Sequence, residues 1–139
     1  MEGYPDSPEI AADAQIWRRV PLFPHLITNA EGIERPSSAA FADSSDGSPM
    51  SVAISTIVRD PWRLVEGQDI PCAVVGFTAG LARGLGLRVC LDTSGEEYEG
   101  HAYLAGPKPK SAKKSLATGS TWVISPSEAR AKHPRKPDT

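Results

Sequence analysis

Residues 72–92, CAVVGFTAGLARGLGLRVCLD, carry the strongest core signal in the chain. The stretch begins with an apolar run, continues with Leu81 and Leu85 at helical i,i+4 spacing, and ends with a run in which alternate residues of 87–91 are apolar. This order predicts a strand, a short helix and a second strand. One longer helix over 73–85 is the alternative, because periodicity alone does not classify a short apolar run.

Strand-like segments rich in β-branched and aromatic residues flank this stretch at 16–20, 51–55, 101–105 and 121–125. We expect the first of them at a sheet edge, because Pro21 ends it. Asp60 and Pro61 have the residue types of a helix N-cap and first helical position, which predicts a short helix there. Together these patterns predict an α+β fold, with a small, mostly antiparallel sheet of about five or six short strands and two or three short helices.

The domain organisation follows from length and local composition. A chain of 139 residues fits one domain. Residues 1–14 lack apolar periodicity and contain two prolines, so we expect a disordered N-terminal arm. Residues 15–125 are expected to form a single globular domain. Residues 126–139 are expected to form a basic, mostly disordered tail, in which 127–132 have the composition of a frayed helix.

The net charge of −2 conceals a division along the chain. Residues 1–106 carry a balance of −8 and residues 107–139 a balance of +6. A basic end either contacts an acidic partner or folds back on the acidic body. There is no apolar run long enough for a membrane helix, and the first residues are acidic, unlike a signal peptide. These features predict a cytoplasmic protein without a membrane partner.

Several kinds of site have no supporting pattern. Cys72 and Cys90 lie in apolar runs, which predicts two buried thiols. His25, His101 and His133 are scattered, and no CxxC or HxxxH spacing accompanies them, so we expect no metal site. The glycine-rich phosphate-loop and dinucleotide-binding motifs are missing, and we expect no bound cofactor.

A serine activated by a histidine can act as a nucleophile. Ser37, Ser38 and Ser51, with His101 as a base, are candidates for nucleophilic catalysis, but no nucleophile-elbow pattern surrounds any of the serines. Serines next to turns are usually capping residues. The sequence therefore leaves the catalytic residues unassigned.

One set of residues points to ligand binding. Arg35, Ser37 and Ser38 lie on a segment that Pro36 holds extended, and His101 begins a predicted strand. If they converge, a guanidinium, two hydroxyls and an imidazole could hold a phosphate or a dinucleotide. In the alternative interpretation Arg35 pairs with a carboxylate and His101 is a partly buried strand residue.

A lysine cluster follows the last-but-one predicted strand. Lys108, Lys110, Lys113 and Lys114 do not match a phosphate-loop pattern, but they are candidates for electrostatic contact with phosphate or an acidic surface.

Four segments carry a resemblance to known proteins: RPSSAAF at 35–41, DGSPMSV at 46–52, FTAGLAR at 77–83 and HA at 101–102. In this order they resemble the shared segments of a set of small bacterial proteins of unknown function. The resemblance extends over about residues 17–123 and implies no activity, cofactor or partner.

Three functional hypotheses follow. The first is a binding or regulatory module that acts through protein contacts. The second is a small phosphate- or nucleotide-binding enzyme, which could be ADP-ribosyl-transfer-like, because such folds use a scattered arginine, a small polar residue and a late acidic residue such as Glu97 or Glu99. The third is nucleic-acid contact through residues 108–136. It is disfavoured because the basic region lacks the interleaved aromatic residues of a stacking surface.

Overall fold

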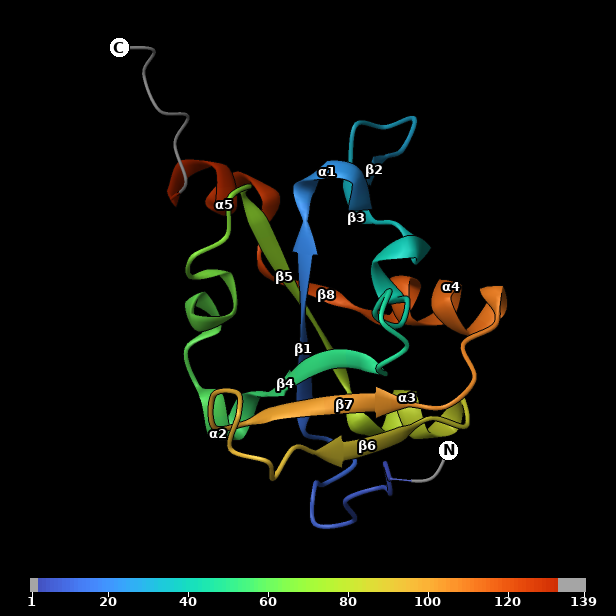
Figure 1. Ribbon diagram of the computed structural model, residues 1–139. Coiled ribbons are helices and arrows are strands. Elements are labelled where there is room, and N and C mark those ends of the chain that lie inside the picture. The colour runs from blue at the N-terminus through green and yellow to red at the C-terminus, as the bar shows by residue number, and fades with distance from the viewer. Residues whose placement is uncertain (1–2, 133–139) are drawn as a thin grey trace.

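The computed structural model describes residues 3–132. Its centre is a six-stranded antiparallel sheet in the order β6-β7-β4-β1-β5-β8 (Figure 1). The expected α+β class is confirmed. The strands are β1 (Gln15–Pro21), β4 (Met50–Ile54), β5 (Cys72–Thr78), β6 (Arg88–Leu91), β7 (His101–Ala105) and β8 (Thr121–Ile124).

Smaller elements cover the sheet. A separate two-stranded hairpin pairs β2 (Leu26–Thr28) with β3 (Glu34–Pro36). The described residues contain more helical segments than the two or three expected, and most of them are a single turn. They are α1 (Leu22–His25), α2 (Ser55–Val58), α3 (Ala79–Gly84), α4 (Lys110–Gly119), α5 (Pro126–Lys132) and the 3₁₀ helices η1 (Ser38–Phe41) and η2 (Pro61–Val65).

The stretch 72–92 folds as a strand, a helix and a strand, β5-α3-β6, so the single long helix is ruled out. Thr78 separates the first two elements, because its side-chain oxygen accepts a hydrogen bond of 3.1 Å from the backbone N–H of Leu81 and caps the helix. Asp60 caps η2 in the same way, accepting from the N–H of Trp62 at 3.1 Å, as its place before Pro61 predicts.

The expectation that residues 16–20 form an edge strand is wrong. β1 lies in the middle of the sheet and pairs with β5 along its whole length. Ile16 and Val20 pack into the apolar cluster on one face, while Trp17 packs into the cluster on the other. A strand buried on both faces is stable in the centre, and Pro21, as its last residue, interrupts the hydrogen-bond ladder only at the end.

Two apolar clusters lie on opposite faces of the sheet. The larger contains Phe41 from η1, Phe77 from β5 and Leu116 from α4. The smaller contains Leu64 from η2 and Ala129 from α5. The helices are therefore divided between the two faces, and each face has its own covering elements.

The N-terminal segment differs from the expected mobile arm. Residues 3–14 lie against the sheet, and the N–H of Ser7 donates to the carbonyl of Val89 at 2.7 Å. The guanidinium of Arg83 contacts Asp6 at 3.1 Å, and it also donates to the carbonyls of Ser7 and Ile10. Ile10 is buried. Backbone hydrogen bonds and the contacts of Arg83 hold this segment in place. It therefore needs no apolar face, and its sequence has little apolar periodicity.

The expected tail also begins as an ordered element. Residues 126–132 form α5, whose Ala129 is buried against the sheet. Ser125 and Glu128 cap its first turn with reciprocal hydrogen bonds of 3.0 and 3.1 Å. The remainder of the expected tail, 133–139, lies outside the described residues.

Candidate functional site

A chain of three polar side chains crosses one side of the sheet. Ser51 Oγ is hydrogen-bonded to His101 Nε2, and His101 Nδ1 is 2.8 Å from Asp92 Oδ2. The side chains of His101 and Asp92 are only 6% and 8% exposed. The three residues come from β4, from β7 and from the position just after β6. We call this group the polar centre and include in it Arg18, which reaches the backbone carbonyl of Ser51 from the other face of the sheet.

Strand register explains why these residues meet. In the β4–β7 pair Ser51 is opposite Tyr103 and Ala53 is opposite His101, so Ser51 and His101 lie on the same face. The N–H of Asp92 donates to the carbonyl of His101 at 3.0 Å, which places the carboxylate beside the imidazole.

The hydrogen-bond partners on either side of His101 define the proton arrangement of its neutral imidazole. Asp92 Oδ2 can only accept while ionised, so Nδ1 carries the hydrogen and Nε2 is left to accept from the Ser51 hydroxyl. A bond from the N–H of Ser94, followed by the contact with His101, holds the pKa of Asp92 below its usual range. The chain Ser51, His101, Asp92 therefore has the polarity of a hydroxyl, a base and an orienting carboxylate.

Two tyrosine rings enclose the imidazole. Tyr98 and Tyr103 meet the His101 ring edge to face, with centroids 5.5 and 4.9 Å away. Burial raises the pKa of both phenols, so both remain neutral at neutral pH. The rings limit the water that reaches the base.

Arg18 lies where β1 and β4 separate. The two strands pair only at Ile16↔Ile54 and Trp17↔Ala53. Beyond these pairs, hydrogen bonds from the Arg18 guanidinium replace the strand pairing. Nη1 donates to the carbonyl of Ser51 at 2.7 Å, and Nε donates to the carbonyl of Ala40 at 3.0 Å. The polar centre thus has a cation anchored on the backbone of its own serine.

The charge of Arg18 is not neutralised by an ion pair. Within residues 3–132 no carboxylate forms a salt bridge with it; Asp43, which is near enough to stabilise its charge, is instead bound to Lys108 at 2.6 Å. Burial lowers the pKa of Arg18 to about 10, and the charge of Arg19 acts in the same direction. Arg18 still carries its full charge at neutral pH, in a partly buried position.

Two buried polar atoms near Arg18 have no hydrogen-bond partner, His25 Nδ1 and Ser37 Oγ. The backbone links them, since the N–H of Ser37 donates to the carbonyl of His25 at 2.9 Å. Burial and the charge of Arg18 lower the pKa of His25. Buried polar atoms are normally satisfied, so unpaired ones beside a buried cation indicate a place where water or a ligand binds.

The residues expected to bind a ligand fall into separate sites. Arg35, Ser38, Lys110 and Lys114 line a hollow of about 640 Å³ between the β2–β3 hairpin and α4. We call it the basic hollow. His101 does not line it and belongs to the polar centre, while the Ser37 hydroxyl is buried near Arg18.

The other two candidate lysines have different surroundings. The side chain of Lys108 is 3% exposed and is bound to Asp43, so it links the 43–49 turn to the end of β7 rather than facing a partner. Lys113 is half-buried on α4 and does not line the basic hollow. Glu97 and Glu99 are exposed, and the late carboxylate that reaches His101 is Asp92.

Sequence reasoning missed Arg18 and Asp92. Arg18 could have been found from its position, because it lies on the same strand face as Ile16 and Val20 and so places a charge among core residues. Asp92 carries no comparable signal, since an aspartate at a strand end usually belongs to a turn.

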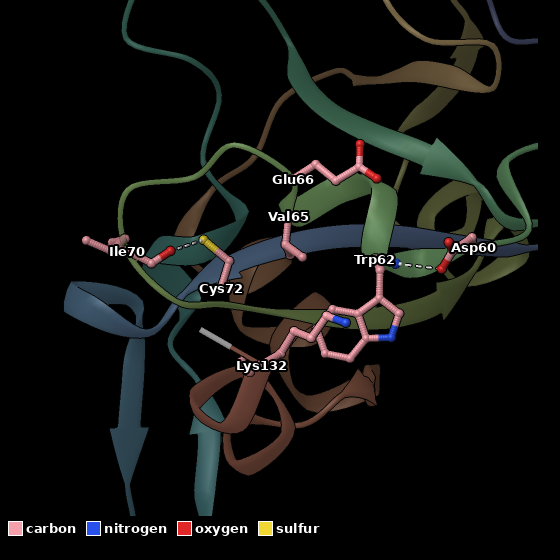
Figure 2. Close-up of a pocket in the computed structure, with 8 residues that line it drawn as sticks. Asp60, Trp62, Val65, Glu66, Ile70, Cys72 and Lys132 are labelled. Carbon is pink, nitrogen blue, oxygen red and sulfur yellow. Dashed lines mark hydrogen bonds between the residues drawn. The ribbon is translucent and has the colours of Figure 1, made fainter. Parts of the chain in front are cut away.

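A second pocket, of about 420 Å³, lies between η2, β5 and α5. Figure 2 shows Trp62 and Val65 facing Lys132, with Cys72 and Ile70 at the other end. Lys132 Nζ is 5.7 Å from the centre of the Trp62 ring, a cation–π distance. Burial raises the pKa of the Cys72 thiol, which makes it a poor nucleophile.

Residues 3–132 contain no cluster of three or more metal-ligating side chains, and none of their helices has the length and apolarity needed to cross a membrane. Comparisons with protein-family models, with curated proteins and with solved structures give no match.

Proposed function

We propose that the protein is a small enzyme that binds a phosphate-bearing nucleotide or dinucleotide at the polar centre. The observation that carries the proposal is Arg18, a partly buried cation without a carboxylate partner in residues 3–132. It bonds the backbone carbonyl of Ser51, whose hydroxyl is hydrogen-bonded to His101 on the other face of the sheet. A guanidinium matches phosphate oxygens with paired N–H donors, and its attraction for an anion increases where water is excluded.

The residue types also support the ADP-ribosyl-transfer-like form of this proposal. Such folds use an arginine, a small polar residue and a late acidic residue, and here Arg18, Ser51 and Asp92 supply these types from β1, β4 and the end of β6. In this proposal Arg18 holds the phosphate. His101 accepts a proton from Ser51 or from a hydroxyl that takes its place, and Asp92 orients the imidazole.

The test compares Arg18 with its neighbour. Isothermal titration with NAD⁺, ADP-ribose and AMP is carried out on the wild type, Arg18→Gln and Arg19→Gln. Arg19 is exposed and bonds the carbonyl of Leu64, so its substitution removes the same charge from the adjacent residue and leaves the bonds of Arg18 to Ala40 and Ser51 in place. We expect at least one ligand to bind, with about tenfold weaker affinity in Arg18→Gln and little change in Arg19→Gln. Circular dichroism verifies that both variants are folded.

Two results would contradict the proposal: no binding of any of the three ligands to the wild type, or equal losses in Arg18→Gln and Arg19→Gln. Ser51→Ala separates catalysis from binding. We expect this variant to keep its affinity for the bound nucleotide within about threefold and to lose catalytic turnover of that nucleotide.

A specific observation favours a protein-binding module as the second candidate. Three large apolar side chains project from the segment around the β2–β3 hairpin, with Phe23 80%, Ile27 53% and Ile33 51% exposed. We propose that this segment contacts a protein partner. A pull-down at low salt should recover a partner with the wild type and with Ile57→Ser, a matched exposed isoleucine on α2, but lose it with Phe23→Ser and Ile33→Ser. Recovery of the same partner by all variants would exclude the hairpin.

A further inference from the structure

The basic hollow combines cations from two elements. Arg35 comes from β3, and Lys110 and Lys114 come from one side of α4, four residues apart. Ser38 and Thr118, which carry hydroxyl groups, also line it, and none of its lining residues is acidic. It shares no residue with the polar centre.

Arg35 is held in a fixed orientation. Its Nη2 donates to the carbonyls of Ala117 and Ser120 at 2.9 Å each, at the C-terminal end of α4. These bonds satisfy carbonyls that a helix end leaves without partners. They also hold the positive charge at the hollow without neutralising it, since no carboxylate in residues 3–132 pairs with Arg35.

The charges on α4 oppose the stability of the helix itself. Lys110, Lys113 and Lys114 lie in its first half, where the helix dipole favours acidic residues, and its first turn has none. Lys110 and Lys114 also repel each other at i,i+4 spacing. A bound anion would relieve both effects at once.

We infer that the basic hollow binds a diphosphate group. A compact anion with more than one negative charge can contact lysines from α4 and the guanidinium of β3 together, and its oxygens can accept from the wall hydroxyls. A volume of about 640 Å³ exceeds what inorganic pyrophosphate needs, so the diphosphate of a nucleotide also fits.

The experiment uses sodium pyrophosphate and ADP as separate probes in isothermal titration. The test variant is Lys110→Gln/Lys114→Gln, in which both changes are on exposed side chains. Lys113→Gln is the first control, because it removes one positive charge from the same helix outside the lining residues. Arg18→Gln is the second control, because it removes the cation of the polar centre and leaves the residues that line the hollow intact.

We expect the wild type to bind pyrophosphate, the double variant to bind it about tenfold or more weakly, and both controls to stay within about twofold. ADP binding that falls together with pyrophosphate binding identifies a nucleotide-borne diphosphate. Pyrophosphate binding with ADP excluded identifies the free anion.

The inference is overturned if pyrophosphate does not bind the wild type. It is also overturned if Lys113→Gln weakens binding as much as the double variant, since the effect is then general attraction to a basic helix. A loss in Arg18→Gln with the double variant unaffected would place pyrophosphate in the polar centre instead.

Discussion

Arg18 shows how a single charged residue can occupy the interior of a small sheet. Burying a cation is costly unless its hydrogen bonds are replaced, and here the carbonyls of Ala40 and Ser51 replace them. The Ser51 carbonyl is free to accept because β4 leaves β1 after two paired residues, whereas Ala40 lies in η1. The arginine thereby compensates for the interrupted ladder and keeps its charge.

The lowered pKa of Asp92 predicts that the stability of the folded protein depends on pH. Its pKa is lowered in the folded protein, so the ionised form contributes stability that is present above the unfolded pKa and is lost as the pH falls through the folded pKa. Asp92→Asn should lower the free energy of unfolding by about 1 to 3 kcal/mol at pH 7. The difference from the wild type should shrink below about pH 4.

Urea unfolding at pH 7 and at pH 3 measures this difference. Asp69→Asn, at an exposed position, is the control and should change stability by less than about 0.5 kcal/mol. A wild-type advantage over Asp92→Asn that is equally large at both pH values would mean that the ionised carboxylate does not provide it.

The two cysteines allow a chemical test of burial. Cys72 and Cys90 are both free and buried, and burial raises the pKa of each thiol. Because the thiolate is the reactive form, both should react with a disulfide reagent at pH 8 about a hundredfold more slowly than a free thiol. Both should react at once in urea. Rapid modification of either thiol in the folded protein would show that its strand opens easily.

At the scale of elements, the polar centre depends on the pairing of β4 with β7. Ser51 and His101 share a face only in the observed register, and a slip by one residue would turn one of them to the opposite face. The carbonyl of Gly100, just before β7, accepts from the N–H of Ile54 at 2.9 Å and so helps to define this register.

Gly100 therefore provides a test of the register. It has a φ of +97°, and a Cβ placed on it would lie 2.6 Å from Cγ2 of Val58. Gly100→Ala should lower the free energy of unfolding by about 2 kcal/mol or more. Gly84→Ala, in α3 with nothing within 4 Å of the added carbon, should be neutral or stabilising by up to about 1 kcal/mol.

Chemical denaturation of both variants measures these effects. The same change of residue type at two glycines separates the local strain at Gly100 from any general effect of alanine. Equal stability of the two variants would contradict the backbone conformation assigned to Gly100.

At the scale of the whole molecule, the two ends of the described chain stabilise opposite faces. Ile10 from the N-terminal segment joins the larger apolar cluster, while Ala129 of α5 joins the smaller one. The segment 3–14 also crosses to β6 and α3 through the contacts of Ser7 and Arg83. The folded unit is consequently larger than residues 15–125.

Substitution of Ile10 tests this enlarged boundary. Ile10→Ala should lower the free energy of unfolding by about 2 to 4 kcal/mol, because it removes buried methyl and methylene groups. Ala11→Ser, at the exposed neighbouring position, should change it by less than about 0.5 kcal/mol. Thermal unfolding of both variants measures the difference in stability. A negligible effect of Ile10→Ala would mean that residues 3–14 form a mobile arm and do not belong to the folded unit.

Local pattern was sufficient for much of the fold. Interactions within a few residues, such as apolar spacing and bonds from a side chain to its own backbone, determine several elements. These are the strand–helix–strand order of 72–92, the cap at Asp60 and the strand at 101–105. For the same reason the sequence alone misplaced β1 at an edge: strand order depends on partners far along the chain, such as β5.

The candidate sites were decided by the tertiary structure. The sequence by itself determined which residues carry charge or a base, including Arg35, His101 and the lysines of α4. Only the folding of the strands decided that His101 meets Ser51 and Asp92, and that Arg35 meets Lys110 and Lys114 instead of His101. The physical reason is that the type of a polar side chain does not determine which residue it contacts. Strand order and register determine the contact, and they depend on burial on both faces of the sheet.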